Sequence, residues 1–283
     1  MSVDIMGHET ILVQSREDLD RFASIIDGQT IVTFDVEGIR LSRTGAPTLA
    51  TFGVQADGVV IVFVFDLFVS SVDYFNDQIA IIKNILQDLS IIKIIHDCRN
   101  DSDALNEFFQ ITLRGIMDTS VYDMLIRKEK FRQNLNNTLK SYDCDVNDLR
   151  NKPKDFYVNN PTYWAERPLT EEQIKCASAD VSFLFQLRER ILSRLPQNHD
   201  IIRAASERAA DEFRSMRCLI DIDVPEEKMG SVFGKNRAVI KKIQKETGAL
   251  VNGYGTGFRV LAKDDRSAEA AKKMILARSE GSK

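Results

Sequence analysis

The sequence predicts an α/β domain built on a mixed β-sheet, followed by a small α+β domain. Near the N-terminus, three apolar runs rich in β-branched and aromatic residues follow one another at 31–37, 48–54 and 59–65. The Asp57-Gly58 turn between the last two is typical of an antiparallel hairpin. Farther along, extended and helical apolar patterns alternate, which indicates parallel βαβ units added to that sheet.

The first elements in chain order are a strand at 10–13 and a helix that begins after the Ser15 cap. The three antiparallel strands come next, and their nearly continuous apolar character predicts burial on both faces. The elements after them are, in order, a helix at 73–89 whose apolar face includes Ile79 and Leu89, a strand at 91–95, a helix from about Asp101 that carries Leu105 and Phe108, a strand at 116–117 and a helix at 121–126. Three antiparallel strands extended by parallel ones are the strand order of a ribonuclease H-like sheet.

The segment 147–168 breaks the periodicity and is too long for a simple connector. Either a functional lid or an arm packed against the sheet would account for its aromatic residues. Thr170 then begins a helix with Glu171 and Glu172 in its first turn, where acids favour the helix dipole. That helix continues to about Leu195, and a further amphipathic helix at 201–213 leads to the second domain.

The composition is that of a folded globular chain, with 283 residues of which 43% are hydrophobic. The cysteines are widely spaced and form no Cys-x-x-Cys pair, which argues against a zinc ribbon and against a disulfide framework. The sequence has neither a run of 18 apolar residues nor the pattern of a secretory leader at its first residues. We therefore expect an intracellular protein, cytoplasmic or nuclear, that makes no contact with a membrane.

Charge is divided unevenly along the chain. Residues 219–283 hold 13 lysine and arginine residues against 9 aspartate and glutamate residues, a balance of +4, whereas the whole chain carries −4. The part before residue 219 is therefore acidic. A basic second domain would suit a polyanionic partner that docks there.

Two carboxylates, Asp35 and Glu37, stand two residues apart in the strand at 31–37. Side chains at this spacing share one face of a strand, so the two acids lie side by side. Like charges this close repel unless a cation or a proton lies between them. An isolated pair is more often a solvated strand end, but further acids follow at the ends of later elements.

These acids are Asp101, in the stretch 96–105, and Asp180, in the stretch 176–181. In order and context, the two stretches and Asp35-Val36-Glu37 resemble the three motifs of the DEDD superfamily of 3′-5′ exonucleases, in the branch that includes ribonuclease D. The sequence Trp-Ala-Glu-Arg-Pro-Leu at 164–169 is similar to the stretch before the third motif of that branch. The resemblance covers about residues 10–195 and implies that Asp35, Glu37, Asp101 and Asp180 bind the metal ions.

The chemistry implied by this resemblance is two-metal hydrolysis of a phosphodiester. Four converging carboxylates hold two divalent ions about 4 Å apart, which stabilise the attacking and leaving oxygens. All-oxygen ligands suit Mg²⁺ or Mn²⁺. For the neighbouring residues we expect simpler roles: Asp97 and Asp103 as cap or surface acids, Asp118 as the N-cap of a helix starting at Thr119, His96 as a packed strand-end residue, and Arg99, Lys152, Lys154 and Arg167 as possible phosphate contacts.

One position departs from the family pattern. In this branch a tyrosine stands four residues before the aspartate of the third motif, and this chain has Cys176 there. The spacing places Cys176 on the same helix face as Asp180, where the tyrosine hydroxyl would orient the attacking water. A neutral thiol is a weaker hydrogen-bonding group. We therefore expect Cys176 to occupy the water-positioning place with a weaker effect than tyrosine. Whether cleavage is slow or absent stays open.

The second domain shows the order strand, helix, helix, strand, strand, helix over residues 217–279. With the Gly234-Lys235-Asn236-Arg237 loop and Lys241-Lys242 on the following helix, it resembles a type I KH domain. In that family a Gly-x-x-Gly loop approaches the backbone of single-stranded RNA, and about four bases lie in the adjoining groove. Arg237 replaces the second glycine here, which hinders close backbone approach but brings a guanidinium within reach of a phosphate.

Residues 1–196 are accordingly expected to form the exonuclease-like domain, 197–216 a helical connector and 217–283 the KH-like domain. The first functional hypothesis is a metal-dependent 3′-5′ exoribonuclease that acts on single-stranded RNA held by the KH-like domain. The alternative is a catalytically weak or inactive RNA-binding adaptor on an exonuclease scaffold, acting in small-RNA or mRNA regulation with protein partners. DNA stays open as a substrate, because no reader of a 2′-hydroxyl is visible in the sequence.

Overall fold

The computed structural model describes residues 2–5, 8–56, 58–148, 160, 162–195, 200–254 and 257–281. The chain divides into two compact units, Met1–Asp211 and Glu212–Lys283, and each is described by itself. Within the described ranges, no helix has both the length and the apolar character needed to cross a membrane.

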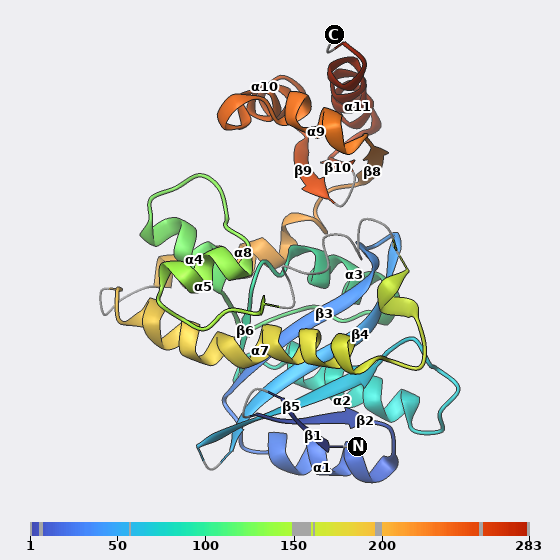
Figure 1. The fold of residues 1–283 in the computed structure, drawn as a ribbon, viewed down its shortest axis with the longest axis vertical. Coiled ribbons are helices and arrows are strands. Elements are labelled where there is room, and N and C mark those ends of the chain that lie inside the picture. The colour runs from blue at the N-terminus through green and yellow to red at the C-terminus, as the bar shows by residue number, and fades with distance from the viewer. Residues whose placement is uncertain are drawn as a thin grey trace. The chain divides into compact units, whose positions relative to one another are not determined.

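In the described part of the first unit, a seven-stranded mixed sheet has the order β1-β2-β5-β4-β3-β6-β7 (Figure 1). Its strands are β1 (Ser2–Ile5), β2 (His8–Val13), β3 (Ile31–Ser42), β4 (Gly45–Ala56), β5 (Val59–Asp66), β6 (Ile92–Ile95) and β7 (Ile116–Asp118). The strands β3, β4 and β5 form the predicted antiparallel meander. β6 pairs in parallel with β3, and β7 in parallel with β6, so the ribonuclease H-like order is confirmed.

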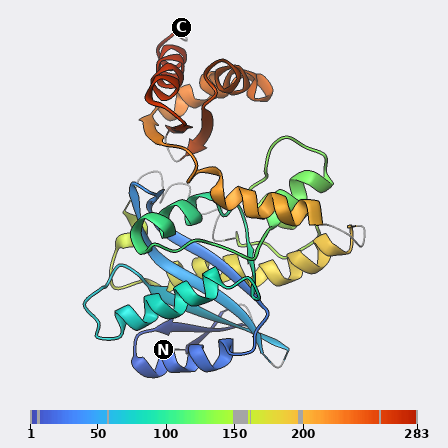
Figure 2. The ribbon, with the colours of Figure 1, turned by 180° about the vertical axis from the view of Figure 1, so that it is seen from behind.

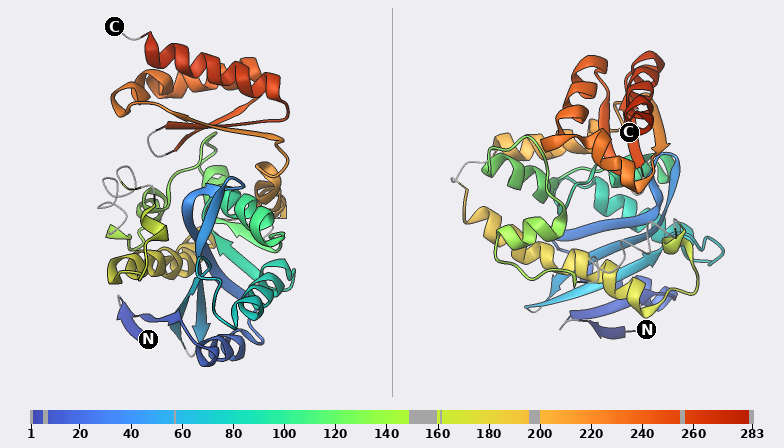
Figure 3. Two further views of the ribbon diagram at one scale, coloured as in Figure 1. Left: turned by 90° about the vertical axis from the view of Figure 1, so that its right-hand side faces the viewer. Right: turned by 45° about the horizontal axis from the view of Figure 1, so that its top comes forward.

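Helices cover both faces of this sheet, as Figures 2 and 3 show from behind and from the side. The helices on one face are α1 (Arg16–Ile26), α2 (Phe75–Gln87), α3 (Arg99–Phe109) and α8 (Asp200–Glu212), and those on the other are α5 (Leu135–Ser141) and α7 (Glu171–Leu192). α4 (Thr119–Ile126) contributes to the core on both sides. Burial on both faces explains why the central strands are apolar along nearly their whole length.

Local sequence signals set the starts of the main helices. Ser15 caps α1 by accepting a hydrogen bond from the backbone N–H of Asp18. Asp118 caps α4 in the same way, as predicted, and Thr170 forms a capping box with Gln173 at the start of α7. Each cap satisfies a backbone donor that the first turn leaves open.

Two predicted core positions are wrong, and one helix was not predicted. Leu89 is 72% exposed because α2 ends at Gln87, before the apolar period does. Phe108 is 44% exposed, because the buried part of α3 runs from Asp101 to Leu105. The short helix α5 has a mostly polar sequence without a long apolar period, and its burial comes from contacts distant in the chain.

The second unit has a three-stranded antiparallel sheet in the order β8-β10-β9, described over its placed residues, with helices on one face (Figure 3, left). Its elements are β8 (Cys218–Asp223), α9 (Glu226–Phe233), η3 (Lys235–Arg237), α10 (Ala238–Thr247), β9 (Leu250–Tyr254), β10 (Gly257–Ala262) and α11 (Asp265–Glu280). Ile240 and Ile243 of α10 lie in its core. This is the type I KH order expected from the sequence.

A lysine is buried in the first unit, where it supports the end of a helix. Lys93 of β6 is fully buried, and its ammonium group donates hydrogen bonds to the carbonyl oxygens of Ile85 and Asp88 at the C-terminus of α2. Burial lowers the pKa of Lys93 to about 8, against the opposing influence of Asp88 and Glu207.

This buried lysine makes stability depend on pH. Between pH 8 and about 10.5 the unfolded chain keeps the proton on Lys93 while the folded chain has released it, so the free energy of unfolding rises with pH in that window. The expected rise is up to about 3 kcal/mol. Urea unfolding of the natural protein and of the Lys93→Met variant is measured across this range. The free energy of unfolding of the natural protein minus that of the variant should rise with pH. A constant difference would contradict the assignment.

Candidate active site

Three carboxylates converge on the face of the sheet that α7 covers. Asp35 and Glu37 project from β3 and Asp180 from α7, and one oxygen of each lies within 4.8 Å of the others. Asp180 is 1% exposed, whereas Asp35 and Glu37 are half-buried. Carboxylates at this separation repel one another, and a divalent cation with oxygen ligands suits the gap between them.

Asp101, the fourth acid of the expected set, lies in the first turn of α3 and is 5% exposed. Among the described residues, the group that satisfies the 4.8 Å separation consists of the other three acids. A second ion lies about 4 Å from the first in two-metal sites, and its ligands need not adjoin those of the first ion. We therefore keep Asp101 as a proposed ligand of a second ion.

The turn that leads into α3 is held by Asp118, which does more than cap α4. Its carboxylate accepts hydrogen bonds from the backbone N–H groups of Asp97 (3.0 Å) and Cys98 (3.2 Å), as well as from Ser120. The carboxylate is fully buried and also accepts a hydrogen bond from Arg132, with 3.3 Å between Nη1 and Oδ2. This single carboxylate thereby fixes the backbone from which Asp101 projects.

Asp97 has a different role from the expected cap or surface acid. It lies in the turn with a φ of 60°, and its carboxylate pairs with Arg99 at 2.6 Å and with Arg132 at 2.7 Å. Burial raises the pKa of Asp97, but the two guanidinium groups outweigh burial and hold it well below its ordinary value. The N-cap position of α3 is occupied by Cys98.

Asp103 is not a surface acid either. It is 3% exposed and pairs with Arg43 from the β3–β4 hairpin, with 2.6 Å between Arg43 Nη2 and Oδ1. Arg43 also donates its backbone N–H to the same carboxylate. The sequence prediction was wrong because the arginine that makes burial tolerable stands 60 residues away in the chain.

The expected phosphate contacts are engaged within the fold or lie outside the described residues. Arg99 pairs with Asp97, and Arg167 pairs with Asp66 through two hydrogen bonds. Lys152 and Lys154 lie outside the described residues. His96 has the expected packing role, with hydrogen bonds to Thr119 Oγ1 (2.8 Å) and to the carbonyl oxygen of Gln133 (3.0 Å).

Cys176 is 2% exposed, one turn before Asp180 on α7, and Asn147 joins the two residues. The side-chain amide of Asn147 donates to Asp180 Oδ1 (2.9 Å) and to the carbonyl oxygen of Cys176 (3.0 Å), and lies 3.8 Å from the thiol. The side-chain amide of Asn136, on α5, donates a hydrogen bond to the carbonyl oxygen of Asn147 and accepts one from its backbone N–H. The sequence carried no signal for Asn147 beyond its place at the start of the aperiodic segment.

In the second unit, the residues expected to bind RNA form one exposed turn and the helix after it. Gly234 has a φ of 67°, and a side chain there would clash with Val239 at 2.5 Å, so glycine is required. Asn236 and Arg237 adopt positive φ values of 54° and 59°. The exposed cations on this turn and on α10 include the four expected ones, Lys235, Arg237, Lys241 and Lys242, and also Lys245.

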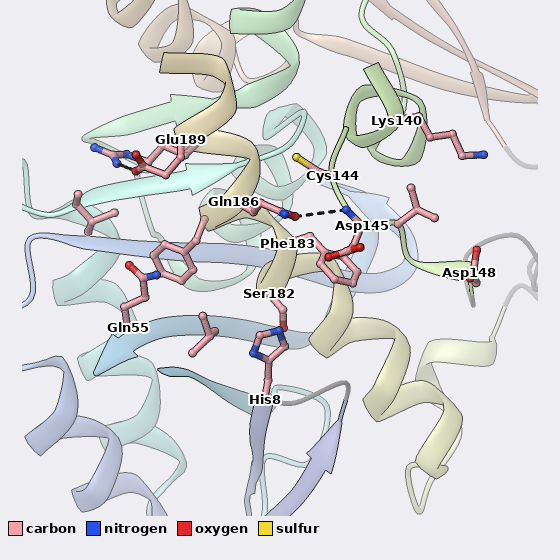
Figure 4. A pocket seen from close by; sticks show the side chains of 15 residues that line it. His8, Gln55, Lys140, Cys144, Asp145, Asp148, Ser182, Phe183, Gln186 and Glu189 are labelled. Carbon is pink, nitrogen blue, oxygen red and sulfur yellow. Dashed lines mark hydrogen bonds and ion pairs between the residues drawn. The ribbon is translucent and has the colours of Figure 1, made fainter. Parts of the chain in front are cut away.

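A hollow of about 840 Å³ lies beside the C-terminal half of α7, away from the acids (Figure 4). Phe183 and Gln186 line it from α7, Asp145 from the loop after α5, and His8 and Gln55 from β2 and β4. Gln186 accepts a hydrogen bond from the backbone of Asp145 across it. Its lining residues do not include Asp35, Glu37 or Asp180, so this hollow is separate from the acidic site.

Family comparison assigns both units. A 3′-5′ exonuclease family model matches residues 10–196, and a KH domain model matches residues 219–277. The piRNA biogenesis protein EXD1 of Mus musculus is 27% identical over 198 residues, which cover 66% of this chain and 33% of that protein. Ribonuclease D of Granulibacter bethesdensis is 28% identical over 198 residues, covering 70% of this chain and 46% of that protein. The chain thus spans between a third and a half of these relatives.

Solved structures show the same fold at low sequence identity. The crystal structure of Trypanosoma brucei RNase D in complex with RNA U12 has a TM-score of 0.57 at 23% identity, covering 70% of this chain and 67% of that chain. Brucella melitensis NrnC with bound Mg²⁺ has a TM-score of 0.52 at 19% identity, covering 72% of this chain and 88% of that chain.

The contacts of Asn147 predict that it positions Asp180 for metal binding. Asn147→Leu keeps the branching of the side chain and the backbone hydrogen bonds but loses both side-chain donors. Because hydrogen bonds behind a metal ligand typically account for 10- to 100-fold in affinity, we expect about that loss in Mn²⁺ affinity. Electron paramagnetic resonance of free Mn²⁺ measures it, with Asn137→Leu on the exposed side of α5 as the matched control. Equal affinities of the two variants would contradict the role.

Proposed function

The chain belongs to the 3′-5′ exonuclease family, and on this premise we propose that it is a metal-dependent 3′-5′ exoribonuclease acting on single-stranded RNA. The observation that carries the proposal is the convergence of Asp35, Glu37 and Asp180 from β3 and α7. Acids from two distant parts of the sequence meet within 4.8 Å, as a shared cation requires.

Asp35, Glu37 and Asp180 would hold one divalent ion, and Asp101 would complete the site for a second. The oxygen-only donor set fits Mg²⁺ or Mn²⁺. When bound, such ions supply the activated water and stabilise the leaving oxygen. The protein's own part is to fix the carboxylates: the Asn147 amide orients Asp180, and the Asp118 carboxylate fixes the turn before Asp101.

Cys176 would stand in the water-positioning place with reduced strength. Its thiol is buried beside the Asn147 amide, and a thiol is a weak donor and acceptor. This position would therefore contribute less to orienting the attacking water than a tyrosine hydroxyl would. This predicts a slower enzyme than relatives that have a tyrosine here.

The second unit would hold the RNA strand. Its KH match and its exposed cations at Lys235, Arg237, Lys241 and Lys242 support this assignment. We propose the boundaries 1–196, 197–216 and 217–283 for the exonuclease unit, the helical connector and the KH unit. Residues 196–199 lie outside the described ranges.

A second candidate function is an RNA-binding adaptor with little or no activity. The buried thiol of Cys176 in the place of the tyrosine favours it, as does the likeness to EXD1, whose name assigns it to piRNA biogenesis. An adaptor would bind RNA through the same two units and would need protein partners.

Cleavage of a 5′-labelled single-stranded RNA in Mn²⁺ separates the two functions. For the enzyme we expect a ladder that shortens from the 3′ end, loss of at least about 100-fold in rate for Asp35→Ala, and acceleration of about tenfold or more for Cys176→Tyr, because general acid–base groups contribute 10²- to 10⁴-fold. Thermal unfolding of each variant verifies folding. RNA left intact by the natural protein would favour the adaptor.

The KH turn predicts a measurable salt dependence. If Arg237 contacts a phosphate, Arg237→Ala should weaken RNA binding and reduce the slope of log affinity against log salt by about 0.7, the value for one contact to a single strand. Fluorescence anisotropy at several salt concentrations measures this slope. Lys263→Ala, a change of an exposed cation before α11, serves as the control. An unchanged slope for Arg237→Ala would contradict the phosphate contact.

A further inference from the structure

An exposed aromatic ring is held in a fixed position just beyond β5. Phe68 is 47% exposed. The Asp66 carboxylate accepts the backbone N–H groups of Phe68 (2.9 Å) and Val69 (3.2 Å), which forms a turn that fixes the backbone under the ring. The Arg167 guanidinium lies 5.6 Å from the ring centroid. The ring is thus exposed to solvent and lies on a hydrogen-bonded turn.

The cation beside the ring is itself immobilised. Arg167 makes two hydrogen bonds to the Asp66 carboxylate, at 2.5 and 2.8 Å. It also donates to the carbonyl oxygens of Thr48 (3.2 Å) and Trp164 (3.0 Å). Because these partners come from β4, β5 and the 3-10 turn η2 (Tyr163–Ala165), three segments combine to present one aromatic ring.

The same contacts lead from Phe68 to the acidic site. Thr48 Oγ1 donates a hydrogen bond to the backbone oxygen of Glu37 at 3.2 Å. The carbonyl oxygen of Thr48 accepts a hydrogen bond from the Arg167 guanidinium. In the sheet, Glu37 lies opposite Leu49, and Leu49 lies opposite Asp66. Residues directly opposite one another point to the same face. Asp66 therefore lies on the face of Glu37 at two strand spacings, about 10 Å.

We propose that Phe68 is a nucleobase-stacking platform on which a base of the single-stranded substrate lies while the strand enters the acidic site. The inference rests on the proposed function, because it places the strand at the acids. An aromatic ring accepts any base by its π-face, and the Arg167 guanidinium beside the ring helps to hold the ring in place. Stacking of one base on such a ring changes affinity by about 5- to 150-fold.

The chain offers a matched control for a binding experiment. Phe108, on α3, is exposed to nearly the same degree as Phe68, at 44% against 47%. Affinity for a short fluorescein-labelled oligouridine is measured with Ca²⁺ in place of Mn²⁺, so that the result does not depend on cleavage. We expect Phe68→Ala to lose about 5- to 150-fold, Phe68→Trp to retain affinity and Phe108→Ala to change little. Equal losses for Phe68→Ala and Phe108→Ala would overturn the platform.

Photochemical crosslinking tests the contact itself. An oligonucleotide with 5-iodouridine near its 3′ end is irradiated with the natural protein, and the crosslinked peptide is identified by mass spectrometry. We expect the crosslink at Phe68. Crosslinks found elsewhere, with none in the peptide that contains Phe68, would overturn the proposal.

The outcomes separate this inference from the proposed function. If the natural protein cleaves RNA and the Phe68→Ala variant binds RNA with unchanged affinity, the proposed function stands and the stacking platform is rejected. If the natural protein leaves RNA intact and the Phe68→Ala variant binds RNA more weakly, the stacking platform stands and belongs to an adaptor. The matching oligodeoxyuridine should show the same loss, because a stacked ring does not read the 2′-hydroxyl. A loss confined to RNA would overturn stacking.

Discussion

The packing of α7 across β3 is the contact on which the candidate site depends. Asp180 reaches Asp35 and Glu37 because the apolar side of α7, which includes Val181, Leu184 and Leu187, is buried against the sheet. The free energy for placing three like charges together therefore comes from apolar burial along the helix. A helix with a weaker apolar side would move away from the acids, since their mutual repulsion acts against the packing.

Elsewhere in the described part of the first unit, several inward-facing acids pair with arginines. Asp103 pairs with Arg43, and Asp123, which has no exposed surface, pairs with Arg127. Such pairs do not add much stability, but loss of either partner would leave a charge buried alone. The three acids at β3 and α7 lie within 4.8 Å of one another, which is the pattern of a site built for a cation.

The sequence predicted those features whose cause is local or periodic. The antiparallel meander followed from apolar runs and a turn, and the cap at Asp118 from its place before a helix. The pairing of Asp103 and the position of Asn147 were not predictable in this way, because both depend on partners that only the tertiary fold brings near. Leu89 shows the opposite error: its period matched a helix that had already ended. Long-range polar contacts leave no period in a sequence.

The shared hydrogen bonds of Asp118 also bear on how the protein opens. One carboxylate binds the backbone at 97 and 98 before α3 and at 120 and 121 within α4. Neither helix start can fray without breaking bonds to the carboxylate that also holds the other, so α3 and α4 would behave as one cooperative unit in native-state fluctuations. Their amide hydrogens would then report a common free energy of opening, and Asp101 would lose its place whenever that unit opened.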